Sequence, residues 1–198
     1  MRYGKEHKEE THKKVVEAAS RRFRRDGIEA TGVVDLMADV GLTHGGFYAH
    51  FSSKETLVKE AIAAASQKSR SHLQREIEKA RSEKRDPLEA IVRAYLTTLH
   101  RDRPDRGCSV AALGSEIARH PRKTREAFTE GLDKTIGIIA SALPDSVTKE
   151  RKEKAYAIFA TMIGSLQLAR AVCDGAMSQS VIDAGISAAL QIGHGAAN

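Results

Sequence analysis

The 198-residue chain has few of the residues that usually interrupt or cross-link a fold. It contains only four prolines and two cysteines, Cys108 and Cys173. So few cysteines fit a reducing compartment, and no Cys or His spacing resembles a zinc site. We therefore expect no metal and no cofactor. The scarcity of proline, together with long stretches rich in Ala, Leu, Lys, Arg and Glu, predicts an all-α protein.

Long hydrophobic runs are missing as well. No stretch approaches the roughly 20 apolar residues that a membrane span needs, and the polar N-terminus does not resemble a secretion signal. The sequence therefore predicts a cytoplasmic protein with no membrane partner. It also has no internal repeat or low-complexity tract. A chain of this length can bury a large core in one or two domains.

Positive charge is in modest excess and unevenly placed. The net charge is +6, from 32 basic and 26 acidic residues. Residues 1–25 contain nine Lys or Arg against four Glu, which leaves +5 in this segment alone. A basic N-terminal segment and first helix supply sequence-independent attraction to phosphate. A solvated helix face with a disordered tail remains the alternative for Met1 to Glu10.

Residues 32–57, GVVDLMADVGLTHGGFYAHFSSKETL, predict two short helices around one tight turn. In the first helix, apolar residues at i, i+3, i+4 and i+7 form one stripe, while Asp35 and Asp39 face water. Those apolar residues are Val33, Leu36, Met37 and Val40. Gly41 suits the left-handed conformation that ends a helix, and Leu42 can fold back on the preceding turn. Thr43 is a suitable N-cap for the next helix.

The second helix has glycines in its first turn. Gly45 and Gly46 each cost roughly 1 kcal/mol relative to Ala in a helix interior, but they allow the backbone to approach phosphate and sink into a groove. Phe47 and Phe51 are i, i+4 partners that we expect to pack inward. His44 and Tyr48 form a second such pair that faces outward. His50 and Lys54 follow where they can grip a DNA backbone, and Ser53 can cap a third helix.

At these residues the sequence resembles the TetR family of one-component repressors, whose DNA-binding domain is similar to residues 11 to about 58. The resemblance implies that Thr43, Tyr48, His50 and Lys54 hold phosphates. It places His44, Gly45 and Gly46 against base edges. Gly32 and Val33, at the start of the first helix of the motif, complete the expected DNA-binding set. Gly32 departs from the family's usual Ser or Thr cap, and Thr31 is a candidate to supply the missing hydroxyl.

Beyond Lys54 the pattern predicts a regulatory body. A long connecting helix over residues 55–81 is followed by Asp86 and Pro87, which open a helix reaching Leu99. A loop over 101–107 precedes helices at 108–119, from 121 or 122 to 143, and at 149–173, and Ser178 caps the last one. The sequence thus predicts about nine helices in two domains. Residues 1–54 form the three-helix DNA-binding domain, and residues 55–198 form the ligand-binding and dimerisation domain.

The resemblance further implies a homodimer through the last two helices, paired as a four-helix bundle. Two reading helices held a helical turn apart, about 34 Å, recognise a near-palindromic operator in double-stranded DNA. It also implies an inducer, a small molecule of unknown identity that binds in the body and releases the repressor. The candidate contacts are Tyr95, Leu99, Cys108, Leu113, Ile117, Phe128, Leu132, Met162, Leu166 and Arg170. Most of these positions also fit ordinary core packing.

Three alternatives stay open. Cys108 follows Gly107 at an expected helix start, and RGCSVAALGSEI resembles an electrophile- and oxidant-sensing branch of the family. The lysine partner of such a sensor is missing, since Ala169 and Arg170 occupy its place, and a buried structural Cys is the simpler interpretation. A Cys-dependent enzyme would pair Cys108 with His100 or His120, but no catalytic motif is present, so we expect no enzyme. A helical adaptor protein leaves the paired glycines unexplained.

Overall fold

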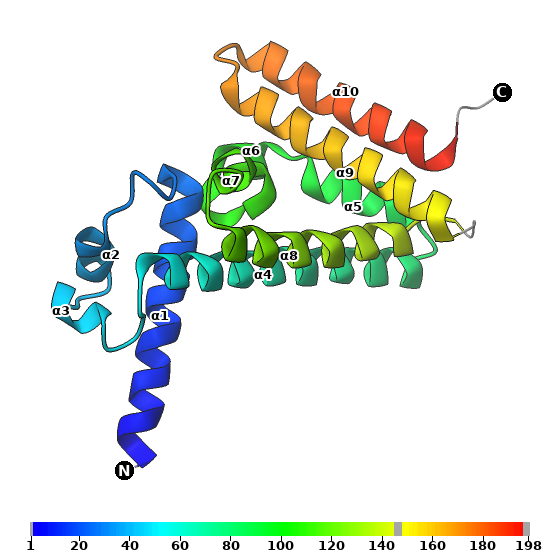
Figure 1. The fold of residues 1–198 in the computed structure, drawn as a ribbon. Helices are drawn as coiled ribbons and strands as arrows, with labels where there is room; N and C mark the ends of the chain where they lie inside the picture. Colours follow the sequence, from blue (N-terminus) through cyan, green and yellow to red (C-terminus); the bar gives the residue numbers. More distant parts are fainter. Residues whose placement is uncertain (1, 145–147, 196–198) are drawn as a thin grey trace.

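The computed structural model describes residues 2–144 and 148–195, and within them it contains ten α-helices, one 3-10 helix and no strand (Figure 1). The predicted all-α fold is confirmed. Met1, part of the expected N-terminal arm, lies outside the described residues. Among the described helices, none is both long enough and apolar enough to span a membrane.

The N-terminal part is built around α1 (Arg2–Asp26), α2 (Val33–Asp39) and α3 (His44–Phe47). Their apolar faces meet the first turns of α4 (Lys54–Ser82) in one buried cluster, which we call the N-terminal cluster. It also takes in Leu113 and Ile117 from α7 (Ser109–Ile117). The division into residues 1–54 and 55–198 therefore remains a prediction, because this core draws on both sides of it.

The long helix α4 connects the two ends of the molecule (Figure 1). Its 29 residues span about 43 Å at 1.5 Å per residue. Leu57 and Ile62 near its start belong to the N-terminal cluster, whereas Leu73 and Ile77 near its end belong to the core of the body. Ser53 caps the helix as predicted, since its hydroxyl accepts the amide N–H of Thr56 at 3.1 Å.

The body consists of α5 (Pro87–Tyr95), α8 (Arg122–Ser141), α9 (Thr148–Ala171) and α10 (Gly175–His194) packed with α4 and α7. Helices α9 and α10 lie side by side along their length (Figure 1). Gly185 makes this close approach possible, because a Cβ atom there would lie 2.2 Å from the Ser165 hydroxyl oxygen. Asp86 caps α5 as predicted by accepting the amide N–H of Leu88 at 2.8 Å.

Two predicted helix boundaries are wrong. The helix expected to reach Leu99 ends at Tyr95, because Thr97 caps a new helix, α6 (Thr98–Asp102), by accepting the amide of His100 at 3.0 Å. The 3-10 helix η1 (Pro104–Arg106) then occupies the predicted loop. In α10, Asp174 rather than Ser178 is the N-cap and accepts the amide of Met177 at 2.7 Å. The Ser178 hydroxyl instead donates to the Ala169 carbonyl on α9.

Candidate nucleic-acid interface and ligand cavity

The turn between α2 and α3 has the geometry predicted for its glycine. Gly41 adopts φ +73°, which favours glycine. Its amide donates to the Ala38 carbonyl at 3.0 Å, and the amide of Leu42 donates to the Met37 carbonyl at 2.9 Å. Leu42 then packs against the N-terminal cluster. The helix end is fixed by these bonds, and the chain reverses directly into α3.

The inner face of α3 is aromatic, as predicted. Phe47 and Phe51 are both buried, and their ring centroids lie 5.4 Å apart in a stacked arrangement. The regular helix stops at Phe47, but the amide of Phe51 still donates to the Phe47 carbonyl at 2.9 Å. The helical path therefore continues far enough to anchor both rings in the core.

The outer face of α3 is open. The Tyr48 side chain is 65% exposed, and its ring lies edge-on to His44 with a centroid separation of 5.8 Å. A Cβ atom on Gly45 would meet nothing within 4 Å. Any surface that docks here therefore reaches the α3 backbone directly, between His44 and Tyr48.

Neither of two predicted caps forms its hydroxyl bond. Thr43 occupies the N-cap position of α3 as predicted, and its carbonyl accepts the amide of Gly46 at 3.0 Å, but its hydroxyl makes no cap hydrogen bond. Thr31 is buried, and its hydroxyl donates to the Gly27 carbonyl at 2.6 Å rather than capping α2. Gly32 caps α2 without a side-chain bond, and half-buried Val33 is the first residue of the helix. The Thr43 hydroxyl is thus available to another partner.

Lys54 and His50 flank this surface in different environments. Lys54 is half-buried at the start of α4, and no described residue forms an ion pair with it. His50 packs toward α1, with its ring centroid 6.1 Å from that of His12 and its Nδ1 atom buried. Burial, with smaller contributions from His12 and Lys8, lowers the pKa of His50. His50 is therefore a neutral hydrogen-bonding group at pH 7 and Lys54 is the cation.

The basic residues of α1 divide into two groups. Arg22 pairs with Asp39 of α2 at 2.6 Å, and buried Arg24 is bound to the body. Lys8, Lys13 and Lys14 are exposed, and no ion pair to another described residue holds them. The charge that remains free to attract phosphate on this helix is thus carried by lysines.

Residues 15–61 match the family model described as "Bacterial regulatory proteins, tetR family". Over this segment the chain matches the TetR family. The regulator TtgR of Pseudomonas putida is 34% identical over 88 residues, which cover 44% of this chain and 40% of TtgR. The regulator YfiR of Bacillus subtilis is 38% identical over 58 residues, 29% of this chain and 28% of YfiR. The chain thus matches less than half the length of these curated relatives.

The fold of the whole chain is also found in solved TetR-family structures. A TetR-family transcriptional regulator from Agrobacterium tumefaciens superposes with a TM-score of 0.73 at 20% identity, covering 91% of this chain and 97% of that one. At this identity the likeness extends only to the fold. The sequence match in the N-terminal part and the structural match over the body together confirm the predicted TetR-family architecture.

A cavity of about 260 Å³ lies in the body between α4, the α5–α6 segment and the start of α7. Three of the ten candidate ligand contacts line it, namely Tyr95, Leu99 and Cys108. Sequence reasoning missed the other side of the cavity, where α4 contributes Lys68 and His72. These α4 residues lie in the polar half of a long helix, and local sequence carries no signal for what faces them.

The other seven candidates lie elsewhere. Leu113 and Ile117 belong to the N-terminal cluster, and Phe128 packs against it. Met162 and Leu166 are buried in the core of the body, and Leu132 packs against that core. Arg170 donates to the carbonyls of His100 and Arg101, at 2.7 and 3.1 Å. None of the seven lines the cavity described above, and their role as ligand contacts stays untested.

His100 holds one wall of the cavity in place. Its Nδ1 atom lies 2.7 Å from the Tyr95 carbonyl oxygen, and its Nε2 atom accepts the backbone N–H of Cys108 at 3.0 Å. The ring is therefore the neutral tautomer with the proton on Nδ1. Burial lowers its pKa from 6.5 to about 4, despite the favourable bond to Tyr95. Gly107 is required beside it, because a Cβ atom there would lie 2.5 Å from the ring.

This geometry bears on the alternatives for Cys108. Both ring nitrogens of His100 are engaged by backbone groups, so His100 cannot take a proton from the thiol, and the enzyme pairing of Cys108 with His100 is not formed. Cys108 is a buried member of the core of the body at the N-cap of α7. The structure thus favours the packing role over the thiol-sensor alternative.

A long-range contact that the sequence did not predict joins the cavity wall to α1. The guanidinium of Arg24 is buried and donates from Nε and Nη2 to the Asp105 carbonyl of η1, and from Nη1 to the Ser20 hydroxyl at 2.9 Å. Asp105 precedes Arg106 and Gly107, which line the cavity. The contact therefore connects the cavity directly to the first helix of the N-terminal part.

Proposed function

We propose that the chain is a DNA-binding transcriptional repressor whose outer α3 surface enters the major groove. The observation that carries this proposal is the open backbone at Gly45, flanked by exposed His44 and Tyr48 and by the free Thr43 hydroxyl. Gly45 and Gly46 allow close approach, and His44 reaches base edges. Thr43, Tyr48, His50 and Lys54 hold phosphates beside the lysines of α1. TtgR and YfiR, named as HTH-type transcriptional regulators, support the same assignment.

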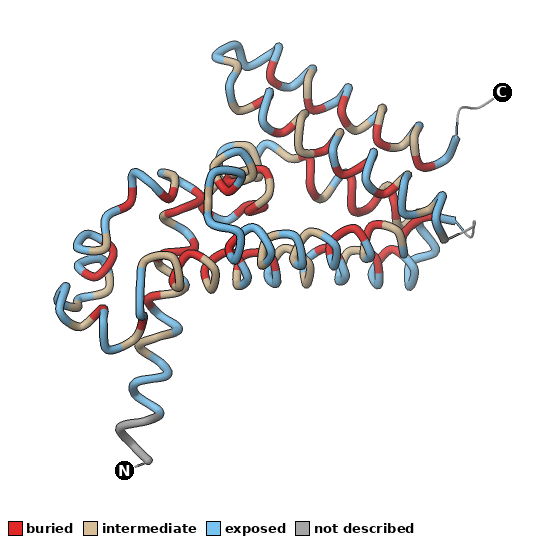
Figure 2. Tube along the Cα trace, in the orientation of Figure 1, coloured by how far each residue is buried: buried red, intermediate tan, exposed pale blue. Residues whose placement is uncertain are grey.

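The proposed active species is a homodimer formed by α9 and α10. Two of the most exposed large apolar side chains in the described chain are here, Leu168 at 60% and Met177 at 59%. On α9, Leu168 continues an i, i+4 row with Tyr156, Ala160 and Gly164, and a Cβ atom on Gly164 would meet nothing within 4 Å, while Met177 lies in the first turn of α10. Exposed positions recur along the outer sides of both helices (Figure 2). A face of apolar and small residues suits packing against its own copy, as a two-fold operator requires.

A small molecule in the cavity is the proposed inducer. The cavity wall at η1 contacts α1 through Arg24, and its opposite wall is α4, which begins at the DNA-binding surface. A ligand that binds more tightly to a conformation with displaced η1 or α4 shifts the population away from the DNA-binding form. The response is then a difference in ligand affinity between two states of the same dimer.

The proposal is tested by a gel shift with the DNA immediately upstream of the gene and an unrelated fragment of equal length. We expect two chains per retarded complex and specific binding that survives an excess of the unrelated fragment. Equal affinity for both fragments, or binding of one chain per site, contradicts the proposal. A Tyr48→Ala variant should weaken binding to the upstream fragment, because it removes an exposed group from the docking surface.

A further inference from the structure

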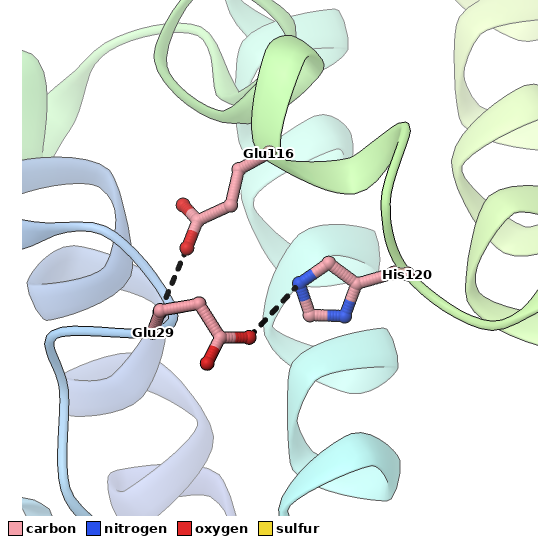
Figure 3. A group of neighbouring side chains, drawn as sticks. All are labelled: Glu29, Glu116 and His120. Atoms are coloured by element: carbon pink, nitrogen blue, oxygen red, sulfur yellow. Dashed lines mark hydrogen bonds and ion pairs between the residues drawn. The ribbon is translucent and has the colours of Figure 1, made fainter.

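Three side chains that are distant in the sequence meet at the junction of the N-terminal part and the body (Figure 3). Glu29 lies in the loop after α1, Glu116 on α7, and His120 just before α8. Their ligand atoms all lie within 4.8 Å of one another. Neither the DNA-binding surface nor the cavity uses these residues.

The Nε2 atom of His120 faces the two carboxylates without a hydrogen-bond partner among the described residues. Its side chain is only 7% exposed, and its Nδ1 atom lies 3.2 Å from a carboxylate oxygen of Glu55, on α4. Nδ1 therefore carries the proton, and Nε2 points its lone pair into the cluster. Nε2 is buried and has no hydrogen-bond partner among the described residues, and Glu29 Oε1 lies 3.9 Å from it. An unpaired buried acceptor that faces carboxylates is placed to bind a cation.

The contacts around the cluster match those of metal sites. A histidine that binds a metal usually donates its other ring N–H to a carboxylate, which fixes the ring and its tautomer. Glu55 takes that place here, and the Thr124 hydroxyl in turn donates to Glu55. Both groups hold His120 in the orientation that a metal ligand requires.

The two carboxylates complete a donor set of one nitrogen and two oxygens. Glu116 is held by the backbone, since its carboxylate accepts the amides of Ile28 at 3.0 Å and Glu29 at 2.7 Å. Each of its oxygens keeps a second lone pair. The Glu29 side chain is 80% exposed and is free to swing toward Nε2. A fixed pair and one movable ligand can close from the present separations to metal-ligand distances of about 2.0–2.2 Å.

We propose that Glu29, Glu116 and His120 bind a divalent transition-metal ion of the Zn²⁺ type, with water completing the coordination. The imidazole disfavours Mg²⁺ and Ca²⁺, which prefer oxygen ligands. Two carboxylates with a neutral imidazole give a local charge that the ion balances. The bound ion ties the loop after α1 to α7 and to the start of α8, so it fixes the DNA-binding part against the body. No local sequence motif reveals this site, because 87 residues separate Glu29 from Glu116.

The test is a Zn²⁺ titration of the untagged full chain by isothermal titration calorimetry, with Glu29→Gln, His120→Gln and His72→Gln variants. His72, a half-exposed residue that lines the cavity and lies outside this cluster, is the matched control, because it lies 3.9 Å from Glu76, the same separation as His120 from Glu29. We expect one Zn²⁺ per chain with a micromolar or tighter Kd. Affinity should fall at least about tenfold in Glu29→Gln and His120→Gln, and stay unchanged in His72→Gln.

Two further readouts separate this site from other binding. Co²⁺ in place of Zn²⁺ should give visible d–d bands without thiolate charge-transfer bands, which excludes binding to Cys108 or Cys173. A hundredfold excess of Zn²⁺ over Kd should raise the melting temperature by about 5–10 °C. If native protein binds no Zn²⁺, or if Glu29→Gln, whose exposed side chain leaves the fold intact, binds it as native protein does, the site does not exist.

Discussion

Replacing Gly45 by Leu tests whether the open backbone of α3 is a docking surface. The side chain has room in the free protein, since a Cβ atom at Gly45 meets nothing within 4 Å. Leu also has a higher helix propensity than Gly, by up to about 1 kcal/mol. The protein free of DNA should therefore be unchanged or slightly more stable, with native far-UV circular dichroism and native elution volume.

The same Leu side chain should strongly weaken binding to DNA. A Leu at this position stands between the α3 backbone and the groove, so base-edge contacts worth about 1–3 kcal/mol are lost in each half-site. Two half-sites give roughly 2–6 kcal/mol, a loss of about thirtyfold or more in operator affinity. Gly45→Ala should lose less, because only one methyl group intervenes.

Fluorescence anisotropy with labelled upstream DNA measures the effect. Gly137→Leu is the matched control, because a Cβ atom on this exposed helical glycine of α8 also meets nothing within 4 Å. It should bind DNA as native protein does. Gly45→Leu protein that is folded, dimeric and within about threefold of native affinity would refute the docking role of the glycine.

Three other changes have defined outcomes. Leu168→Asp should convert the proposed dimer to monomer in light scattering, because it places a charge in the exposed apolar row of α9. Leu99→Asp, at an exposed leucine beside the cavity, should leave the dimer intact. If both variants remain dimeric, the interface lies elsewhere. Arg24→Met should lower the free energy of unfolding by about 2 kcal/mol through lost charged hydrogen bonds to Asp105, while Arg25→Met, at an exposed position, should change it far less. Equal losses in the two variants would contradict a stabilising contact between α1 and η1. The pKa of His100 is lowered from 6.5 to about 4 on folding, so its contribution to stability is complete above pH 6.5 and falls by about 3 kcal/mol as pH drops toward 4. His100→Gln should flatten the plot of unfolding free energy against pH over this range, and His44→Gln should not. Parallel plots for native and His100→Gln protein would show that His100 does not cause the loss of stability at low pH.

Features set by neighbouring residues could be predicted from the sequence. The left-handed turn at Gly41, the inward pair Phe47 and Phe51, and the caps at Ser53 and Asp86 each depend on a few adjacent positions. Their energetics are local, because a helix end satisfies its free amides and carbonyls within about four residues. The local geometry of the α2–α3 segment could therefore be predicted from one short run of residues.

Features set by tertiary contacts could not be predicted. Thr31 is a plausible cap by sequence, yet its hydroxyl bonds to Gly27 within the buried turn after α1. Arg24 finds its carbonyl partner 81 residues away at Asp105, and the α4 side of the cavity lies on a helix whose sequence pattern is merely polar. Such contacts depend on how α1, α4 and α7 pack against one another, and the spacing of residues within one helix does not determine that packing.

The salt dependence of DNA binding tests the central assignment most directly. Affinity for the upstream fragment should be measured at several salt concentrations for native, Lys54→Ala and Lys79→Ala protein. Both lysines lie on α4, with Lys54 at its first residue and Lys79 in its last turn, about 37 Å apart along the helix. If Lys54 holds a phosphate in each half-site, Lys54→Ala lowers the magnitude of the slope of log K against log salt by about 2 and Lys79→Ala leaves it unchanged. Equal slopes for all three proteins, or no preference for the upstream DNA, would contradict the account.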